Sequence, residues 1–177
     1  IPMLPEVLSN GICSLNAGED RYAMTCMMEI DTNGKVVNYR IQPSIIHVNR
    51  RCSYKEIYKA LTEDIIPDDL APLMPMIHNL SDIAKTLNDM RRRRGALDFD
   101  FPEYKVLLDT EGIPLRIVRR DRTLAERLIE ECMLIANETV ATHLKNTNRT
   151  SVYRIHETPS EEKMSMYQKV LNYLGQD

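Results

Sequence analysis

Clustered carboxylates are the first residues in this sequence that could carry out chemistry, because hydrolases that use two metal ions bind them with such clusters. Glu130 and Glu131 lie inside an apolar stretch, between Ile129 and Cys132, where an unpartnered charge is costly. Their position fits either an ion pair with Arg127 or another helix, or a functional site. An acidic pair at the start of an expected helix is stabilised by the helix dipole, which indicates a structural role for it. The other acidic pairs are Asp68-Asp69, Asp98 with Asp100, and Glu161-Glu162.

A run of arginines precedes the two phenylalanines of the chain, and this combination would suit single-stranded nucleic acid. The run Arg91 to Arg94 ends at Gly95, and Phe99 and Phe101 follow shortly after. Guanidinium groups can bind phosphates while a base stacks on an aromatic ring. The alternative is a solvated helix end, with both phenylalanines alternating into a strand and filling the core. Spacing alone favours this alternative.

Other catalytic and metal-binding patterns are missing from the sequence. No glycine-rich nucleotide loop, serine-hydrolase elbow or H-E-x-x-H motif occurs. The cysteines form no C-x-x-C pair, so we expect neither a zinc site nor disulfides, and we expect Cys26 and Cys132 to be buried, reduced thiols. The scattered histidines lack a spacing typical of a catalytic base.

Length, composition and charge describe an ordinary globular chain. Its 177 residues are 43% hydrophobic and 28% charged, which is enough chain for one domain with a sizeable core. The formal net charge of −3 gives no general support for a nucleic-acid partner, which would need a local basic patch. No apolar run approaches the roughly 20 residues of a membrane helix, and no secretory signal is recognisable. We therefore expect a cytoplasmic protein without a membrane partner.

Antiparallel hairpins are the first elements expected to position these residues. Alternating apolar and polar residues predict strands, and Asn33-Gly34 predicts a hairpin between the first two. In the first strand Met24, Cys26 and Met28 are expected on one face. The predicted strands cover 21–30, about 35–46, 104–108, 114–118 and 151–156.

Amphipathic helices complete the expected α+β fold, which contains no βαβ nucleotide-binding unit. Each helix start except the second is marked by a capping box, a hydroxyl residue three positions before a glutamate. Residues 1–20 are apolar but aperiodic, so we expect them to pack on something else. The capping boxes are Ser53 with Glu56, Thr123 with Glu126, and Thr158 with Glu161. The predicted helices cover about 53–63, 73–94, 123–140 and 158–174.

Six segments, taken in their order along the chain, form a more specific pattern than any single motif. They are 1–15 (IPMLPEVLSNGICSL), 18–21 (GEDR), Ser44-Ile-Ile followed by Arg51 and Tyr54, 94–99 (RGALDF), 128–137 (LIEECMLIAN) and 153–157 (YRIHE). This order resembles that of the RNB exoribonucleases, the family of ribonuclease II and ribonuclease R, and is closer to ribonuclease R. The resemblance covers essentially the whole chain.

The resemblance implies a processive, Mg²⁺-dependent hydrolase that removes nucleoside 5′-monophosphates from the 3′ end of single-stranded RNA. The family's inner clamp phenylalanine matches Phe99, and its tyrosine near the terminal ribose matches Tyr54. The acid tied to the choice of RNA over DNA matches Glu130. A 2′-hydroxyl both donates and accepts hydrogen bonds, so a phenol and a carboxylate are suitable readers. The further RNA-binding expectations are Arg92, Arg93 and Arg94.

The same resemblance places essential parts of the family's catalytic domain outside this sequence. The metal-binding aspartates and the outer clamp aromatic precede the segment that matches Ile1, and an arginine motif at the scissile phosphate follows residue 177. The cold-shock and S1 domains are also missing. We therefore expect 1–177 to be a partial RNB catalytic domain that binds no Mg²⁺ and is inactive alone. Surface exposed by truncation would allow oligomers. The alternative is a non-catalytic RNA-binding or scaffold module with the RNB fold.

Overall fold

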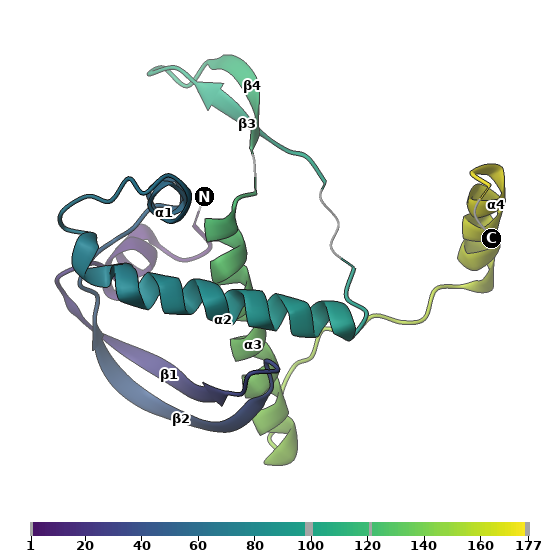
Figure 1. Cartoon of the computed structure of the whole chain (residues 1–177), viewed down its shortest axis with the longest axis horizontal. Coiled ribbons are helices and arrows are strands. Elements are labelled where there is room, and N and C mark those ends of the chain that lie inside the picture. The colour runs from purple at the N-terminus through teal and green to yellow at the C-terminus, as the bar shows by residue number, and fades with distance from the viewer. Residues whose placement is uncertain (1, 98–100, 121, 176–177) are drawn as a thin grey trace. The chain divides into compact units, whose positions relative to one another are not determined.

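Two compact units make up the chain in the computed structural model, which describes residues 2–97, 101–120 and 122–175. The first unit is Ile1–His143 and the second is Leu144–Asp177. Figure 1 labels the strands β1–β4 and the helices α1–α4. In chain order they are η1 (Val7–Ile12), β1 (Asp20–Ile30), β2 (Val36–His47), α1 (Tyr54–Thr62), η2 (Ala71–Leu73), α2 (Met74–Arg93), β3 (Glu103–Leu108), β4 (Pro114–Arg120), α3 (Leu124–Asn146) and α4 (Glu161–Tyr173).

Each sheet in the described part of the chain is a two-stranded antiparallel hairpin, β1 with β2 and β3 with β4. Together with the helices they confirm the expected α+β class. One detail of β1 is corrected: Met24 is 70% exposed, whereas Cys26 and Met28 are half-buried. The alternation shifts by one residue between Thr25 and Cys26, so odd-numbered residues face inward before this point and even-numbered residues after it. Pro43, which pairs with Met24, has no N–H to donate, so the hydrogen-bond ladder is interrupted near this change.

The turn between β1 and β2 packs directly on α2. The carboxylate of Asp31 accepts hydrogen bonds from the backbone N–H groups of Asn33 and Lys35, each at 2.9 Å. The bond from Lys35 is the main reason why the pKa of Asp31 lies below its usual value. Gly34 has a φ of +87°, and a Cβ built on it would lie 3.1 Å from both Met90 Cβ and the Thr86 carbonyl oxygen. The Asn-Gly turn is therefore constrained by its contact with the helix as well as by its own geometry.

We expect Gly34→Ala to destabilise the chain more than the matched change Gly112→Ala. Both glycines have positive φ, where a side chain costs roughly 1–2 kcal/mol, but nothing lies within 4 Å of a Cβ at Gly112. Only the Gly34 variant also has to displace Met90 and the backbone of α2. Urea unfolding of the two variants measures the difference. Equal losses of unfolding free energy would show that the turn does not depend on this close packing.

The helix starts follow the capping chemistry, with one correction. At α1, Ser53 Oγ accepts from the Glu56 N–H at 3.3 Å, and Glu56 accepts from the Ser53 N–H at 3.4 Å, as predicted. At α4 the cap is Ser160, whose side chain accepts from the Lys163 N–H at 3.4 Å, and not Thr158. Ser160 is itself a preferred cap residue, and its hydroxyl takes this place two residues after Thr158.

The strand expected over 151–156 is not present, because these residues are described without regular secondary structure. Alternation alone produces only an extended segment, and a strand also needs a hydrogen-bonding partner. In the second unit, α4 leaves several large side chains exposed, including Met166 and Tyr173.

The buried apolar cluster of the first unit lies between α1 and the start of α2 and consists of Ala60, Leu70, Met74 and Ile77. Helix α3 packs against α2 and against the β1–β2 hairpin. Figure 1 shows α2 crossing α3. On the hairpin side, Thr139 donates to Met28 Sδ at 3.3 Å, and the rings of Tyr39 and His143 meet edge-on with centroids 5.7 Å apart. These contacts on two sides make α3 the central helix of this unit. The buried residues of α3 are Ala125, Leu128, Glu131, Ile135 and Thr139.

The cysteines are free thiols, and Cys26 and Cys132 are half-buried rather than fully buried. Burial, followed by the nearby charge of Glu131, raises the pKa of Cys132. Within the described ranges, no helix has both the length and the apolar character needed to cross a membrane.

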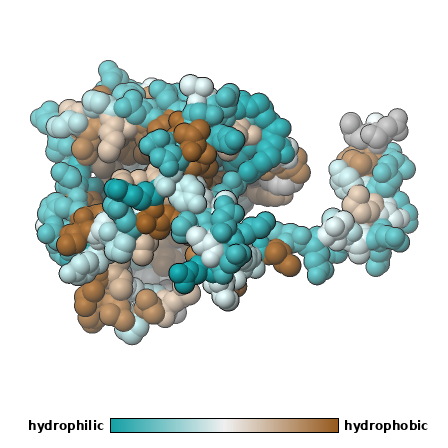
Figure 2. All heavy atoms as spheres, turned by 90° about the horizontal axis from the view of Figure 1, so that it is seen from below, coloured by the Kyte–Doolittle hydropathy of each residue, from teal (hydrophilic) through white to brown (hydrophobic). Residues whose placement is uncertain are grey.

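Apolar side chains also remain on the surface, as the brown patches on the face drawn in Figure 2 show. Residues 2–20 contribute several of them: Met3 is fully exposed, and Val7 and Ile12 are mostly exposed. The aperiodic N-terminal segment therefore buries little of its apolar surface in this structure. Exposed patches of this kind are typical of interaction surfaces.

Candidate functional site

A cavity of about 200 Å³ lies where the N-terminal parts of α1, α2 and α3 meet. Tyr54, the first residue of α1, lines this cavity, and so does Ile129 of α3. Because Glu130 follows Ile129 directly, the fold brings the helix start carrying Tyr54 close to the turn of α3 that carries Glu130. The lining residues are Arg50, Cys52, Ser53, Tyr54, Ile57, Leu73, Met76, Ile77, Leu80, Ala125, Leu128 and Ile129.

The two neighbouring glutamates of α3 each lie beside an arginine but differ in exposure, and a functional role for either of them stays a prediction. Glu131 is 4% exposed, accepts a hydrogen bond from Asn88 Nδ2 at 2.9 Å and lies 3.5 Å from Arg91 Nε. It therefore makes the predicted ion pair with another helix. The side chain of Glu130 is 40% exposed and pairs with Arg122. Glu130 is thus the carboxylate of the pair that a ligand could reach.

A cluster of ion pairs around Arg50, just before α1, was missed by sequence reasoning. Arg50 donates from Nη1 and Nη2 to the two carboxylate oxygens of Glu56, at 3.0 and 2.6 Å, and from Nε to Asp69 at 2.8 Å. These bonds lower the pKa of both carboxyl groups and raise that of Arg50. Asp69 therefore has a specific partner in addition to its place before a helix. No local spacing could reveal this, because the partners are 19 residues apart.

The arginine run at the end of α2 is largely engaged within the chain. Arg91 approaches Glu131, and Arg93 donates to the Asn33 carbonyl at 3.0 Å. Arg94 donates from Nη1 and Nη2 to the two carboxylate oxygens of Glu138, at 3.1 and 2.8 Å. Any phosphate bound by Arg93 or Arg94 would therefore share or replace these partners, and a phosphate-binding role for Arg92, Arg93 and Arg94 stays a prediction.

The aromatic residues beyond the run are described only in part. Phe101 is 76% exposed, so the alternative in which it fills the core is wrong for this structure. Phe99, the expected base-stacking residue, lies outside the described residues, as do Asp98 and Asp100.

The Arg94–Glu138 pair predicts an acid-sensitive contribution to stability. The hydrogen bonds that Glu138 accepts from Arg94 hold the pKa of Glu138 below its usual value. A folded-state pKa below the unfolded one stabilises the fold at neutral pH, and this gain is lost as the pH falls below about 4. We expect Glu138→Gln to lower the unfolding free energy at pH 7 and to have a smaller effect in acid. Asp89→Asn, at an exposed position of α2, is the control. The same pH dependence in Glu138→Gln as in the parent chain would contradict the assignment.

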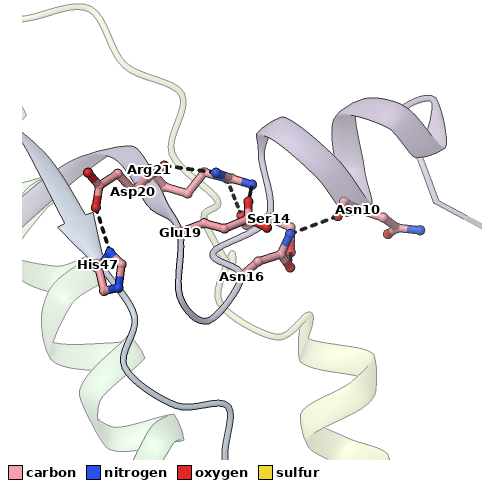
Figure 3. Close-up of polar contacts among 7 residues, drawn as sticks. All are labelled: Asn10, Ser14, Asn16, Glu19, Asp20, Arg21 and His47. Atoms are coloured by element: carbon pink, nitrogen blue, oxygen red, sulfur yellow. Dashed lines mark hydrogen bonds and ion pairs between the residues drawn. The ribbon is translucent and has the colours of Figure 1, made fainter.

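A second polar cluster orders the loop before β1, where the segment 18–21 lies (Figure 3). Arg21 Nε donates to the Ser14 carbonyl at 3.1 Å, and the guanidinium also pairs with Glu19. Across the hairpin, the carboxylate of Asp20 lies 2.7 Å from His47 Nδ1. These contacts connect residues 14–19 to the first pair of strands. They give Asp20 and Arg21 a structural role in a segment that matched the family pattern.

Metal binding has no support in the described part of the chain. Within residues 2–97, 101–120 and 122–175, no three His, Cys, Asp or Glu side chains are grouped so that they could bind one ion. Of the acidic pairs considered from the sequence, Asp69, Glu130 and Glu131 pair with arginines instead. These residues do not fit a Mg²⁺ site, and we assign no chemical step to a metal bound by them.

The sequence matches the family model described as "RNB domain" over residues 1–176. It is 42% identical over 176 residues to ribonuclease R of Thermotoga maritima, covering 99% of this chain and 25% of that protein. With ribonuclease R of Escherichia coli it shares 35% identity over 176 residues, or 99% of this chain and 22% of that protein.

Solved structures show the same likeness. The chain superposes with a TM-score of 0.92 and 30% identity on Mycoplasma genitalium RNase R in complex with ribose-methylated single-stranded RNA, covering 98% of this chain and 27% of that one. The chain spans about a fifth to a quarter of the length of the curated relatives it matches.

Proposed function

The chain belongs to the RNB domain family, and we propose that it forms the part of a ribonuclease R-like 3′-to-5′ exoribonuclease that binds the 3′ end of single-stranded RNA. One observation carries this proposal: nearly the whole chain shares the fold of an RNase R that was solved with single-stranded RNA. The cavity that places Tyr54 near the α3 turn carrying Glu130 supports it, because these are the two residues matched to readers of the terminal ribose.

In this proposal residues of this chain bind and orient the RNA. The phenol of Tyr54 and the carboxylate of Glu130 contact the 2′-hydroxyl, which distinguishes RNA from DNA. Phe99 stacks on a base near the 3′ end, and the arginines at the end of α2 attract phosphates. The complete enzyme would release nucleoside 5′-monophosphates with Mg²⁺ bound by residues beyond this segment. Free thiols at all cysteines suit a reducing, cytoplasmic setting.

The rival proposal is an RNA-binding or scaffold module that keeps the fold without the chemistry. The lack of grouped metal ligands within the described residues agrees with both proposals, because the first places those ligands beyond this segment. Both proposals include RNA binding, so only hydrolysis in a more complete protein separates them.

We expect the isolated chain to bind 5′-labelled single-stranded RNA and to release no mononucleotide with Mg²⁺, because metal-assisted hydrolysis needs ligands that the described residues do not group together. An EDTA control accompanies the assay. EDTA-sensitive shortening from the 3′ end would contradict the expectation and would point to Asp98, Asp100, Glu130 and Glu131 as possible ligands.

A chimera tests the function of the parent protein. In it, this chain replaces the matching segment of Thermotoga maritima ribonuclease R, to which it is 42% identical. We expect the chimera to release nucleoside 5′-monophosphates from the 3′ end of RNA, and EDTA to stop the reaction. A chimera that folds cooperatively and binds RNA but releases nothing would favour the non-catalytic module.

A further inference from the structure

We propose that Arg50 is a positioning residue that fixes Tyr54 at the edge of the cavity and thereby supports discrimination at the terminal ribose. The inference rests on the proposed function. Arg50 and Tyr54 line the same cavity, yet Arg50 reaches it from the linker between β2 and α1. Its contacts are with the protein, so its effect on the site would pass through the tyrosine.

The guanidinium of Arg50 uses all three of its nitrogen atoms within the chain. Nη1 and Nη2 donate to Glu56 at 3.0 and 2.6 Å, and Nε donates to Asp69 at 2.8 Å. Nη1 also lies 3.2 Å from Cys52 Sγ. With only 18% of its side chain exposed, Arg50 is poorly placed to bind a phosphate itself.

The partners of Arg50 belong to two different segments, the first turn of α1 and the loop before η2. Glu56 belongs to the first turn of α1, which begins at Tyr54, and it also caps that turn through the Ser53 N–H. Asp69 precedes Leu70, which is fully buried in the core beneath the start of α2. Arg50 therefore joins the turn that carries Tyr54 to a segment held firmly in the core.

Arginine is specifically suited to this place. Its planar fork binds both oxygens of one carboxylate and leaves Nε free for a second acceptor in the same plane. A lysine offers a single nitrogen, so it can keep one of the two carboxylates but cannot reproduce the geometry. Arg50→Lys should therefore restore only part of the function that Arg50→Ala removes.

The test is a double-mutant cycle in the chimera, with RNA ending in a ribonucleotide or in a 2′-deoxynucleotide. We expect Arg50→Ala to reduce the preference for the ribonucleotide end about tenfold, equivalent to about 1.4 kcal/mol. Tyr54→Ala should have a similar effect, and the double variant should be no worse than Tyr54→Ala. Lys85→Ala, which removes an exposed ion pair on α2, is the control.

The possible results test the positioning role of Arg50 separately from the proposed exoribonuclease function. A loss of preference that is shared between Arg50→Ala and Tyr54→Ala supports positioning, whereas equal losses on both RNA ends, or additive effects, overturn it. If Arg50→Ala fails to fold, Glu56→Gln replaces it in the cycle, because the amide oxygen can still cap α1. A folded parent chimera that does not degrade RNA overturns the proposed function instead; RNA binding by the isolated chain, with and without the Arg50 change, then shows whether Arg50 supports binding.

Discussion

Arg91→Met is expected to lower the unfolding free energy by about 3–5 kcal/mol, because it leaves a buried carboxylate without its counter-charge. Glu131 is 4% exposed on the side of α3 that packs on α2, and Arg91 Nε is 3.5 Å from it. Asn88 would still donate to Glu131 at 2.9 Å, but a neutral amide does not balance the charge. Urea unfolding of the isolated chain, followed by circular dichroism, measures the loss.

Two further variants show whether the loss comes from burial of the charge. Lys85→Met breaks the exposed pair with Asp82, and exposed pairs contribute at most about 1 kcal/mol. The combined change Arg91→Met with Glu131→Leu should recover much of the stability, because an apolar pair can replace a buried ion pair. If Arg91→Met costs no more than Lys85→Met, Arg91 does not stabilise Glu131.

Local patterns predicted most elements because strands and helix starts depend on neighbouring residues. The Asn33-Gly34 turn and the Ser53 capping box were both predicted from a few residues, and both are confirmed. The errors arose where a second local preference or a distant partner decided the outcome. Ser160 rather than Thr158 caps α4, and the segment 151–156 found no partner strand.

The polar contacts of the site could be predicted only in part. The sequence showed that one of two adjacent glutamates needed a partner, but the choice of Glu131 depends on which side of α3 faces α2. Its partner Asn88 is 43 residues away, and Arg50 likewise reaches Asp69 from the other end of α1, 19 residues along the chain. Such pairs follow from tertiary packing, which no spacing rule contains.

The roles of the site residues came from the family resemblance, so they are less firmly established than family membership itself. Membership of the family is shown by the match over residues 1–176. The fold places Tyr54 at a cavity beside the turn of α3 that carries Glu130, which makes a shared site possible. The individual roles stay predictions, because a fold can be shared while residues change function.

Phe99→Ala in the chimera is expected to change the length of the final RNA product more than the affinity for RNA. A stacked base contributes only about 1–3 kcal/mol, whereas phosphate contacts along the strand supply much of the affinity. Loss of the ring should therefore leave long RNA bound but release short products at a different length. Denaturing gels of 5′-labelled RNA resolve these lengths, and filter binding measures affinity.

The chain offers its own control for this change, because its second and only other phenylalanine, Phe101, lies two residues further along. Phe101 is 76% exposed, and the resemblance assigns it no contact with RNA. Phe101→Ala removes the same aromatic surface from the same segment, so we expect it to leave the product length unchanged. If both variants yield the parent's products, Phe99 does not stack on RNA. If both shift the length equally, the segment contributes apolar surface rather than one specific clamp residue.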